Sequence, residues 1–308
     1  MDREHAHAGT IERPPPSPAT GGSSALDDAF ERMGTTDFEL PNGFVNHGPM
    51  ACEALAALGC DDRVPDWARW FVQMVGEGPQ PVEPARVSDF EGLDALGVYG
   101  RLPEWIGYFE GAVALEGWER VVELWVPRLM PGLVTALFHG VIRTAHAVRA
   151  IDSVETGPRR AELARALGYW AARFHPGDDV TEVGAETETG AAVIAAAAEG
   201  ARHYVAQPTI FNLHGVTGAM AVDLLVDHLG ADAASAALAQ LRADHASLYG
   251  GQVLRSGAEA TGGWDPGLAP RAADSRDAHQ VKLVEACRRG WEASGDPAFV
   301  AAAELVSR

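Results

Sequence analysis

Lysine occurs once in this sequence, at position 282, whereas arginine fills the other 23 of its 24 Lys and Arg positions. A buried lysine can lose its proton and act as a nucleophile, and an arginine cannot. His279 lies three residues earlier, so on a helix both side chains share one face, about one turn apart. The pair of His279 and Lys282 therefore predicts a site that uses a neutral lysine amine, which arginine cannot replace. The alternative is compositional, because a GC-rich bacterial genome encodes few lysines.

Five histidines share one property: each lies in a helical segment beside small residues or turns that would let its ring approach a common point. Imidazole is the commonest transition-metal ligand in proteins, and histidines from separate helices can build a site inside a bundle. The alternative for each is an ordinary core or surface histidine. The five are His47, His139, His146, His214 and His279.

Two of these histidines are too far apart to share one ion. His146 follows His139 by seven residues, which places it on the same helix face but roughly 10 Å along the axis. We therefore expect only one of them to be a ligand and His146 to pack beside the site. The remaining histidines, among them His175, His203, His228 and His245, lie near helix ends or among charges and are expected to be ordinary.

The elements that must position these side chains are helices. Residues 1–25 are rich in Pro, Gly and Ser and predict a disordered tail, and residues 26–308 predict one compact, all-α, multi-helix domain. No alternating strand pattern persists along the chain. Residues 250–271 predict a long loop of the kind that can form a lid. The expected helices include residues 66–75, 130–149, 159–174, 188–206, 210–228, 231–248 and 297–306.

The composition limits the partners that the protein can have. A net charge of −19 without a basic run argues against nucleic acid and anionic membranes. The longest apolar run, residues 191–198, is too short to span a bilayer. Three cysteines, Cys52, Cys60 and Cys287, form no CxxC pair, which favours a reducing cytoplasm. We therefore expect a soluble cytoplasmic protein, monomeric or homodimeric, that acts on a small molecule.

Common catalytic motifs are absent from the sequence. It contains no GxGxxG after a strand, no GxxxxGK[ST], no HExxH and no GxSxG. Within the expected helical domain, residues 26–308, Glu-x-x-His pairs and the HxD or HxE seed of a two-histidine, one-carboxylate iron site are also missing. An enzyme with this sequence would therefore use a less common site.

Four sequence blocks together resemble the questin oxidase-like family. They span nearly the whole folded part of the chain and occur in the expected order. Each block contains one of the histidines named above. The blocks are Asn46-His47-Gly48-Pro49-Met50-Ala51, Phe138-His139-Gly140-Val141-Ile142-Arg143, Leu213-His214-Gly215-Val216-Thr217-Gly218, and His279-Gln280-Val281-Lys282-Leu283-Val284-Glu285.

The resemblance implies a mostly helical oxygenase that acts on polycyclic aromatic polyketides such as anthraquinones. The reaction would be a Baeyer–Villiger-type oxygen insertion or an oxidative ring cleavage. Some members look like non-haem iron enzymes, and their motif histidines fall here on His47, His139, His214 and His279. The family is also described as NADPH-dependent, although this sequence has no glycine-rich nicotinamide fingerprint.

These observations lead to a mechanistic hypothesis. The four motif histidines bind iron(II), and Lys282 supplies an anionic oxygen ligand as a carbamate formed from CO₂ and its neutral amine. An open position then binds O₂ or a substrate phenolate, and Arg143 pairs with a substrate oxygen. Lys282 could instead act as a Schiff-base or general-base amine, or pair with Glu285 or Asp277. A structural salt bridge is the alternative for Arg143.

Two other functions remain open from the sequence. The same ligands could hold zinc or manganese in a hydrolase or decarboxylase, where the metal lowers the pKa of a bound water. The chain could also be a helical small-molecule binding protein without turnover.

Overall fold

The prediction of an all-α fold is confirmed. The structure is a computed structural model that describes residues 22–83, 94–177, 180, 189–252 and 262–308. In these parts of the chain the only extended pairings are two isolated bridges, Thr36 with Glu77 and Glu39 with Val45. The α-helices are α1 Gly22–Met33, α2 Gly48–Ala57, α3 Val64–Val72, α5 Leu102–Glu116, α6 Trp118–Leu129, α7 His139–Ser153, α8 Gly157–Arg173, α9 Thr189–Ala206, α10 Ile210–Val226, α11 Ala231–Tyr249, α12 Leu268–Ser275, α13 Ala278–Ser294 and α14 Pro297–Val306.

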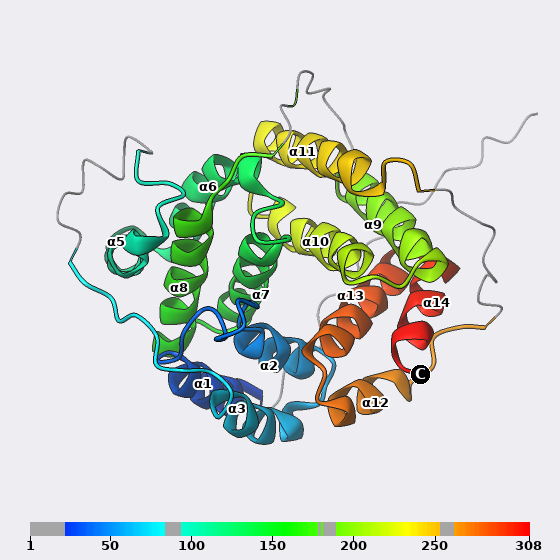
Figure 1. The fold of residues 1–308 in the computed structure, drawn as a ribbon, viewed down its shortest axis with the longest axis horizontal. Coiled ribbons are helices and arrows are strands. Elements are labelled where there is room, and N and C mark those ends of the chain that lie inside the picture. The colour runs from blue at the N-terminus through cyan, green and yellow to red at the C-terminus, as the bar shows by residue number, and fades with distance from the viewer. Residues whose placement is uncertain (1–21, 84–93, 178–179, 181–188, 253–261) are drawn as a thin grey trace, which may run out of the picture.

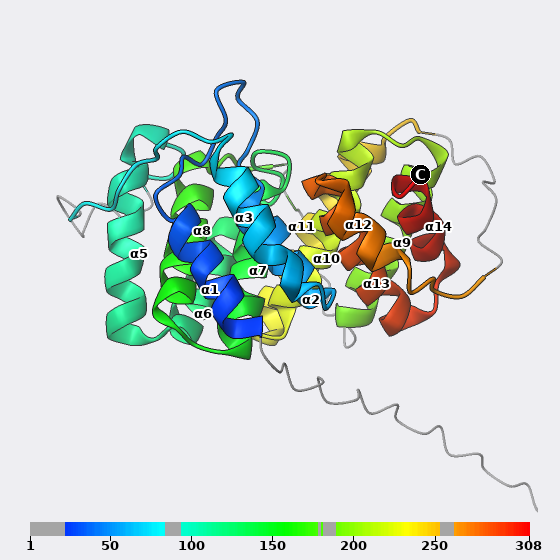
Figure 2. The ribbon, with the colours of Figure 1, turned by 90° about the horizontal axis from the view of Figure 1, so that it is seen from below.

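Four helices, α2, α7, α10 and α13, lie around the middle of the molecule (Figure 1). Twelve of the 15 residues of α7 and 13 of the 17 residues of α10 are buried, so both helices are enclosed on nearly all sides. On one side α7 packs against α8, which packs against α5, and on the other α10 packs against α9 (Figure 2). The four central helices therefore occupy the core, and the remaining helices cover them.

Buried ion pairs join the same four helices. Arg149 of α7 binds two carboxylates, Glu53 of α2 at 2.7 Å and Glu285 of α13. Arg289 of α13 binds Glu285 at 2.7 Å and Asp223 of α10 at 2.8 Å. The arginines hold the pKa of the Glu285 carboxyl well below its usual value despite burial. Removing one partner of such a network is costly, so the network fixes the helices relative to one another.

The central helices start in one layer and run in the same sense. Each of them has one of the four motif histidines near its first residue and a member of the ion-pair network six to ten positions later. Because both the histidines and the charges meet, the four helices point the same way. At 1.5 Å per residue, the charged layer lies roughly 10–15 Å below the histidines. Neighbouring helices that start in the same layer cannot be joined by short loops, which explains why other helices lie between them along the chain.

The start of α7 corrects a prediction. The sequence suggested a helix from about Met130, but α6 continues through Pro127 to Leu129, and α7 begins only at His139. Between them the chain makes a short 3₁₀ turn and then three consecutive left-handed residues, with φ of 49°, 56° and 65° at Ala136, Leu137 and Phe138. None of the three is glycine, so each costs about 1–2 kcal/mol.

Packing holds this left-handed turn in place. The Phe138 side chain is fully buried against Gly218 of α10, where an added Cβ would lie 2.6 Å from the ring. A larger residue at position 218 would displace the ring. The turn therefore sets where α7 begins and how His139 is presented.

Two other predicted boundaries shift. The helix α1 begins at Gly22, a few residues before the expected end of the tail at about residue 25, while residues 1–21 lie outside the described part of the chain. The expected loop at 250–271 contains the start of α12 at Leu268, and residues 253–261 of it are not described. No helix in the described ranges is long and apolar enough to cross a membrane.

Candidate metal centre

The chain starts its central helices at or just before the histidines. His47 is the N-cap residue of α2, His139 is the first residue of α7, and His279 is the second residue of α13. The Asp277 carboxylate caps α13 by accepting a hydrogen bond from the His279 backbone N–H at 2.8 Å. His214 lies in the second turn of α10. The sequence signals that begin these helices thus place all four side chains at one end of the bundle.

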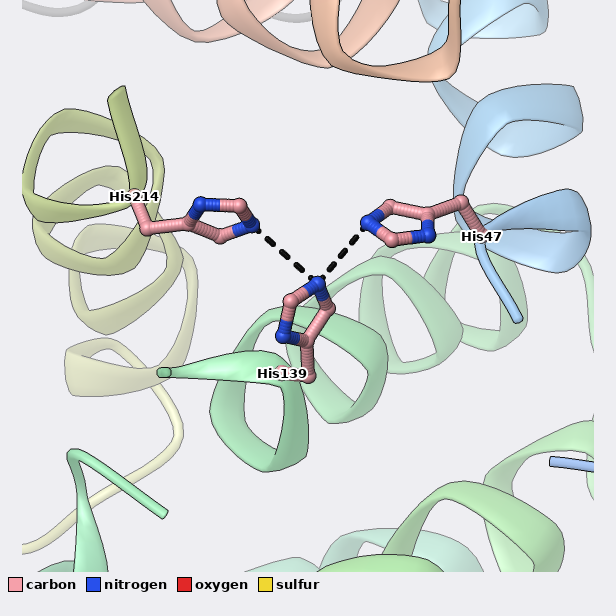
Figure 3. Close-up of side chains that lie close together, drawn as sticks. All are labelled: His47, His139 and His214. Carbon is pink, nitrogen blue, oxygen red and sulfur yellow. Dashed lines mark hydrogen bonds between the residues drawn. The ribbon is translucent and has the colours of Figure 1, made fainter. Parts of the chain in front are cut away.

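Three of the imidazole rings point at one another (Figure 3). The Nε2 atom of His139 lies 2.8 Å from Nε2 of His47 and 3.1 Å from Nε2 of His214. All three rings are buried, and their ligand atoms lie within 4.8 Å of one another. Nitrogen donors converge in this way around a shared ion.

The opposite ring nitrogens show which tautomers are present. In each ring Nδ1 lies at hydrogen-bond distance from a backbone carbonyl oxygen, and a carbonyl can only accept, so Nδ1 carries the proton. A neutral imidazole has one N–H, so each Nε2 then has a lone pair. The acceptors for His47, His139 and His214 are the carbonyl oxygens of Val45, Ala136 and Ile210, at 2.5, 2.5 and 2.8 Å respectively.

The surroundings keep these three rings neutral. Burial holds the pKa of His47, His139 and His214 well below 6.5, and the nearby Lys282 amine lowers each of them further. Three neutral rings then present three lone pairs to one another with no proton between them. A cation would relieve this contact, and metal-bound histidines characteristically donate their other N–H to a backbone carbonyl. The three histidines could therefore hold a metal ion.

His279 borders this triad. Its ring centroid lies 4.5 Å from that of His47 and 5.3 Å from that of His214. Its Nδ1 lies 3.6 Å from a carboxylate oxygen of Asp277, and its side chain is 28% exposed. Burial lowers its pKa below 6.5, although Asp277 opposes this effect. His279 is thus the most solvent-accessible of the four histidines and lies at the edge of the cluster.

Lys282 is buried beside the histidines. Its side chain is 1% exposed, and Nζ has no hydrogen-bond partner among the residues that the structure describes. Burial lowers the pKa of Lys282 to about 7, so near neutral pH much of the amine is uncharged. The structure overturns the alternative ion pair with Glu285, because that carboxylate binds Arg149 and Arg289.

Two further side chains singled out in the sequence have structural partners. Arg143 donates two hydrogen bonds to the buried Glu162 carboxylate, at 2.7 and 2.9 Å, and its guanidinium stacks on Phe38 at 4.6 Å. This is the structural salt bridge that was the alternative to a catalytic role. His146 donates to Glu53 at 2.5 Å within the ion-pair layer, away from the Nε2 cluster.

Comparison with known proteins adds nothing to this geometry. No family model matches the chain, and no curated protein matches it either. The resemblance to the questin oxidase-like family therefore stays a prediction from the four sequence blocks, and the function must be argued from the site itself.

Sequence reasoning missed the layer below the histidines. Glu53, Arg149, Glu285 and Arg289 are charged residues in helical segments, which usually face solvent. Their pairing depends on which helix faces meet, and a single sequence does not show this. The spacing offers one signal in retrospect, because an acidic residue follows both His47 and His279 by six positions.

Proposed function

We propose that this protein is an iron(II)-dependent oxygenase that acts on a planar aromatic polyketide, such as an anthraquinone. The reaction would insert oxygen next to a carbonyl or cleave a carbon–carbon bond of the ring system. The observation that carries the proposal is the convergence of three neutral, buried Nε2 donors, with His279 at the edge of the cluster. Imidazole ligands suit iron, and bound iron(II) would supply one-electron chemistry with O₂. Such chemistry needs no organic cofactor, and the sequence contains none of the usual glycine-rich motifs for one.

Lys282 is proposed to complete the ligand set as a carbamate. Its neutral amine attacks the carbon of CO₂, a C–N bond forms, and one N–H proton leaves to solvent, giving a group with one negative charge. Burial favours this step because it lowers the pKa of the amine to about 7. The unpartnered Nζ supports the idea, since a carbamate would give that buried atom a bonding role.

The N-termini of the four central helices favour anions at the same place. Each helix has a partial positive charge at its N-terminus, roughly half an elementary charge. Four such ends meet around His47, His139, His214 and His279. Together they stabilise negative charge on a carbamate, on a substrate phenolate or on reduced oxygen. This supports a reaction in which negative charge develops on oxygen.

Metal analysis and oxygen uptake test the proposal. Protein purified without oxygen is expected to contain about one equivalent of iron and to consume O₂ when 1,8-dihydroxyanthraquinone is added, with or without NADPH. One equivalent of zinc or manganese without iron, together with hydrolysis or decarboxylation, would instead identify the hydrolytic enzyme. Binding of the quinone by protein without metal or turnover would identify a binding protein.

A substitution series tests the carbamate separately. Lys282→Arg keeps a cation of similar length but cannot react with CO₂, so we expect loss of iron and of O₂ uptake. Removing CO₂ from the buffer should lower the activity of the wild-type protein, and added bicarbonate should restore it. Full activity and full metal content in Lys282→Arg would exclude the carbamate.

A further inference from the structure

A cavity of about 520 Å³ lies between α9 and α11, and none of the candidate metal ligands lines it. Sites for small organic molecules usually have volumes of about 300–1,000 Å³. One wall is formed by Ala192, Ala195 and Ala196 of α9, whose small side chains leave room for a flat molecule. The size and the smooth wall suit a planar ligand.

Aromatic rings form another part of the lining. His203 of α9 and Tyr249 of α11 are stacked in parallel, with ring centroids 4.1 Å apart and 1° between the ring planes. The His245 ring meets Tyr249 edge-on at 4.9 Å. All three line the cavity, so a ligand ring inside it would contact flat π surfaces. His203 and His245 were expected from the sequence to be ordinary, because they lie near helix ends or among charges.

His245 offers a hydrogen-bond acceptor to the cavity. Its Nε2 donates to the Gly215 carbonyl oxygen at 3.1 Å, and burial lowers its pKa to about 4, so the ring is neutral at pH 7. Nδ1 therefore carries a lone pair. The structure shows no partner for this atom among the described residues, and the ring lines the cavity, so Nδ1 is the acceptor that His245 can offer to a ligand there.

The position of Tyr249 is fixed by glycines. A Cβ added at Gly215 of α10 would lie 1.9 Å from the Tyr249 hydroxyl oxygen, and one added at Gly200 of α9 would lie 2.8 Å from it. Both helices therefore lack a side chain where the hydroxyl is inserted. Gly215 follows the metal-site residue His214 directly, so α10 separates the cavity from the histidine cluster.

The rim carries both signs of charge. Glu199 of α9 and Arg242 of α11 both line the cavity. Their opposite charges give little preference for a charged ligand. The Gln252 amide also lines the cavity, but it is hydrogen-bonded to Asn212 and to the Leu248 carbonyl oxygen. The acceptor on His245 can therefore select a ligand with a donor such as a hydroxyl group.

We propose that this cavity binds a neutral, planar, hydroxylated aromatic molecule, whose hydroxyl group donates to Nδ1 of His245 while its ring packs on Tyr249 and the alanine wall. The site is separate from the candidate metal centre. It does not depend on the proposed oxygenase activity, because no candidate metal ligand takes part.

Titration calorimetry with 2-naphthol, on the full-length protein as purified, tests the site. We expect saturable binding of one equivalent. Ala246→Trp places a large side chain in the cavity and should weaken binding at least tenfold, while Ala236→Trp should leave it within twofold. Both alanines are exposed on α11, and only Ala246 lines the cavity. Absence of saturable binding, or equal binding by the two variants, would overturn the proposal.

The hydrogen bond is tested with a matched ligand. 2-Methoxynaphthalene has the same ring system without the donor, so it should bind about fivefold more weakly to the wild-type protein. In His245→Phe this preference should vanish. Should that variant not fold, the two ligands on the wild-type protein still decide the point. Removing the metal with a chelator should leave naphthol binding unchanged, and binding that disappears with the metal would place the probe at the metal centre instead.

Discussion

Replacing Lys282 by methionine is expected to remove a pH-dependent cost from the folded state. Burial lowers the pKa of this amine from 10.5 to about 7, and Nζ has no hydrogen-bond partner within the described residues. In the unfolded chain the amine keeps its ordinary pKa. Folding below pH 7 therefore buries a charge, and folding between pH 7 and 10.5 requires the loss of a proton.

The size and sign of this cost follow from the two pKa values. The interval from 10.5 to about 7 corresponds to roughly 5 kcal/mol, at about 1.36 kcal/mol per pKa unit. Within that interval the unfolded state binds the proton and the folded state does not, so the free energy of unfolding rises with pH. The cost is complete below about pH 7 and vanishes above pH 10.5. A change from pH 7 to pH 9 should relieve about 2 kcal/mol of it.

Urea unfolding at pH 7, 8 and 9 provides the measurement. Metal-free protein in CO₂-free buffer is compared with Lys282→Met under the same conditions. We expect the wild-type protein to gain about 2 kcal/mol relative to the variant across this range. The neighbouring histidines do not interfere, because their pKa values lie below 6.5. Parallel pH profiles for the two proteins would refute the reasoning, since they would mean that the amine keeps its charge or has a partner.

Three further substitutions probe the site. Ala136→Gly relieves the strain of a left-handed residue, so the free energy of unfolding in urea should rise by about 0.5–1 kcal/mol. Metal titration should show roughly tenfold weaker binding, because the carbonyl that holds Nδ1 of His139 becomes less constrained. Unchanged metal affinity would contradict this role of the turn. His139→Ala should reduce the bound metal measured by mass spectrometry to near zero. The control His175→Ala, at an exposed position, should keep its metal. Equal metal content in the two variants would exclude His139 as a ligand. Arg143→Ala leaves the Glu162 carboxylate buried without its partner and should cost about 3–5 kcal/mol in thermal or urea unfolding; a purely catalytic arginine would leave stability intact.

The sequence predicted the all-α fold and the set of histidines that are candidates to meet, because both depend on local signals. His47 and His279 stand beside Pro49 and Asp277, residues that start helices, and this locates their side chains at helix N-termini. Nothing in the sequence showed that four such ends would converge. Convergence depends on the directions of helices separated by 65 to 92 residues, and therefore on packing across the whole chain.

The failure at residues 130–138 has a different cause. Apolar periodicity through this stretch suggested helix, and no glycine marked the left-handed residues Ala136, Leu137 and Phe138. Their conformation is stabilised by the burial of Phe138 against Gly218, a residue 80 positions away. Local propensity was overridden by tertiary packing, and this occurred directly before a candidate ligand. Strained backbone of this kind tends to occur at functional sites.

The candidate ligands lie far apart along the chain, and this affects the order in which they are synthesised. His47 and His279 are 232 residues apart. At typical rates of about 5–20 residues per second, a ribosome needs roughly 12–46 s to pass from the first codon to the last. During that interval the growing chain exposes two and then three of the candidate ligands without Lys282. The full set of candidate ligands exists only once α13 has been made and has docked, so a metal that needs the full set can bind only after translation has nearly ended.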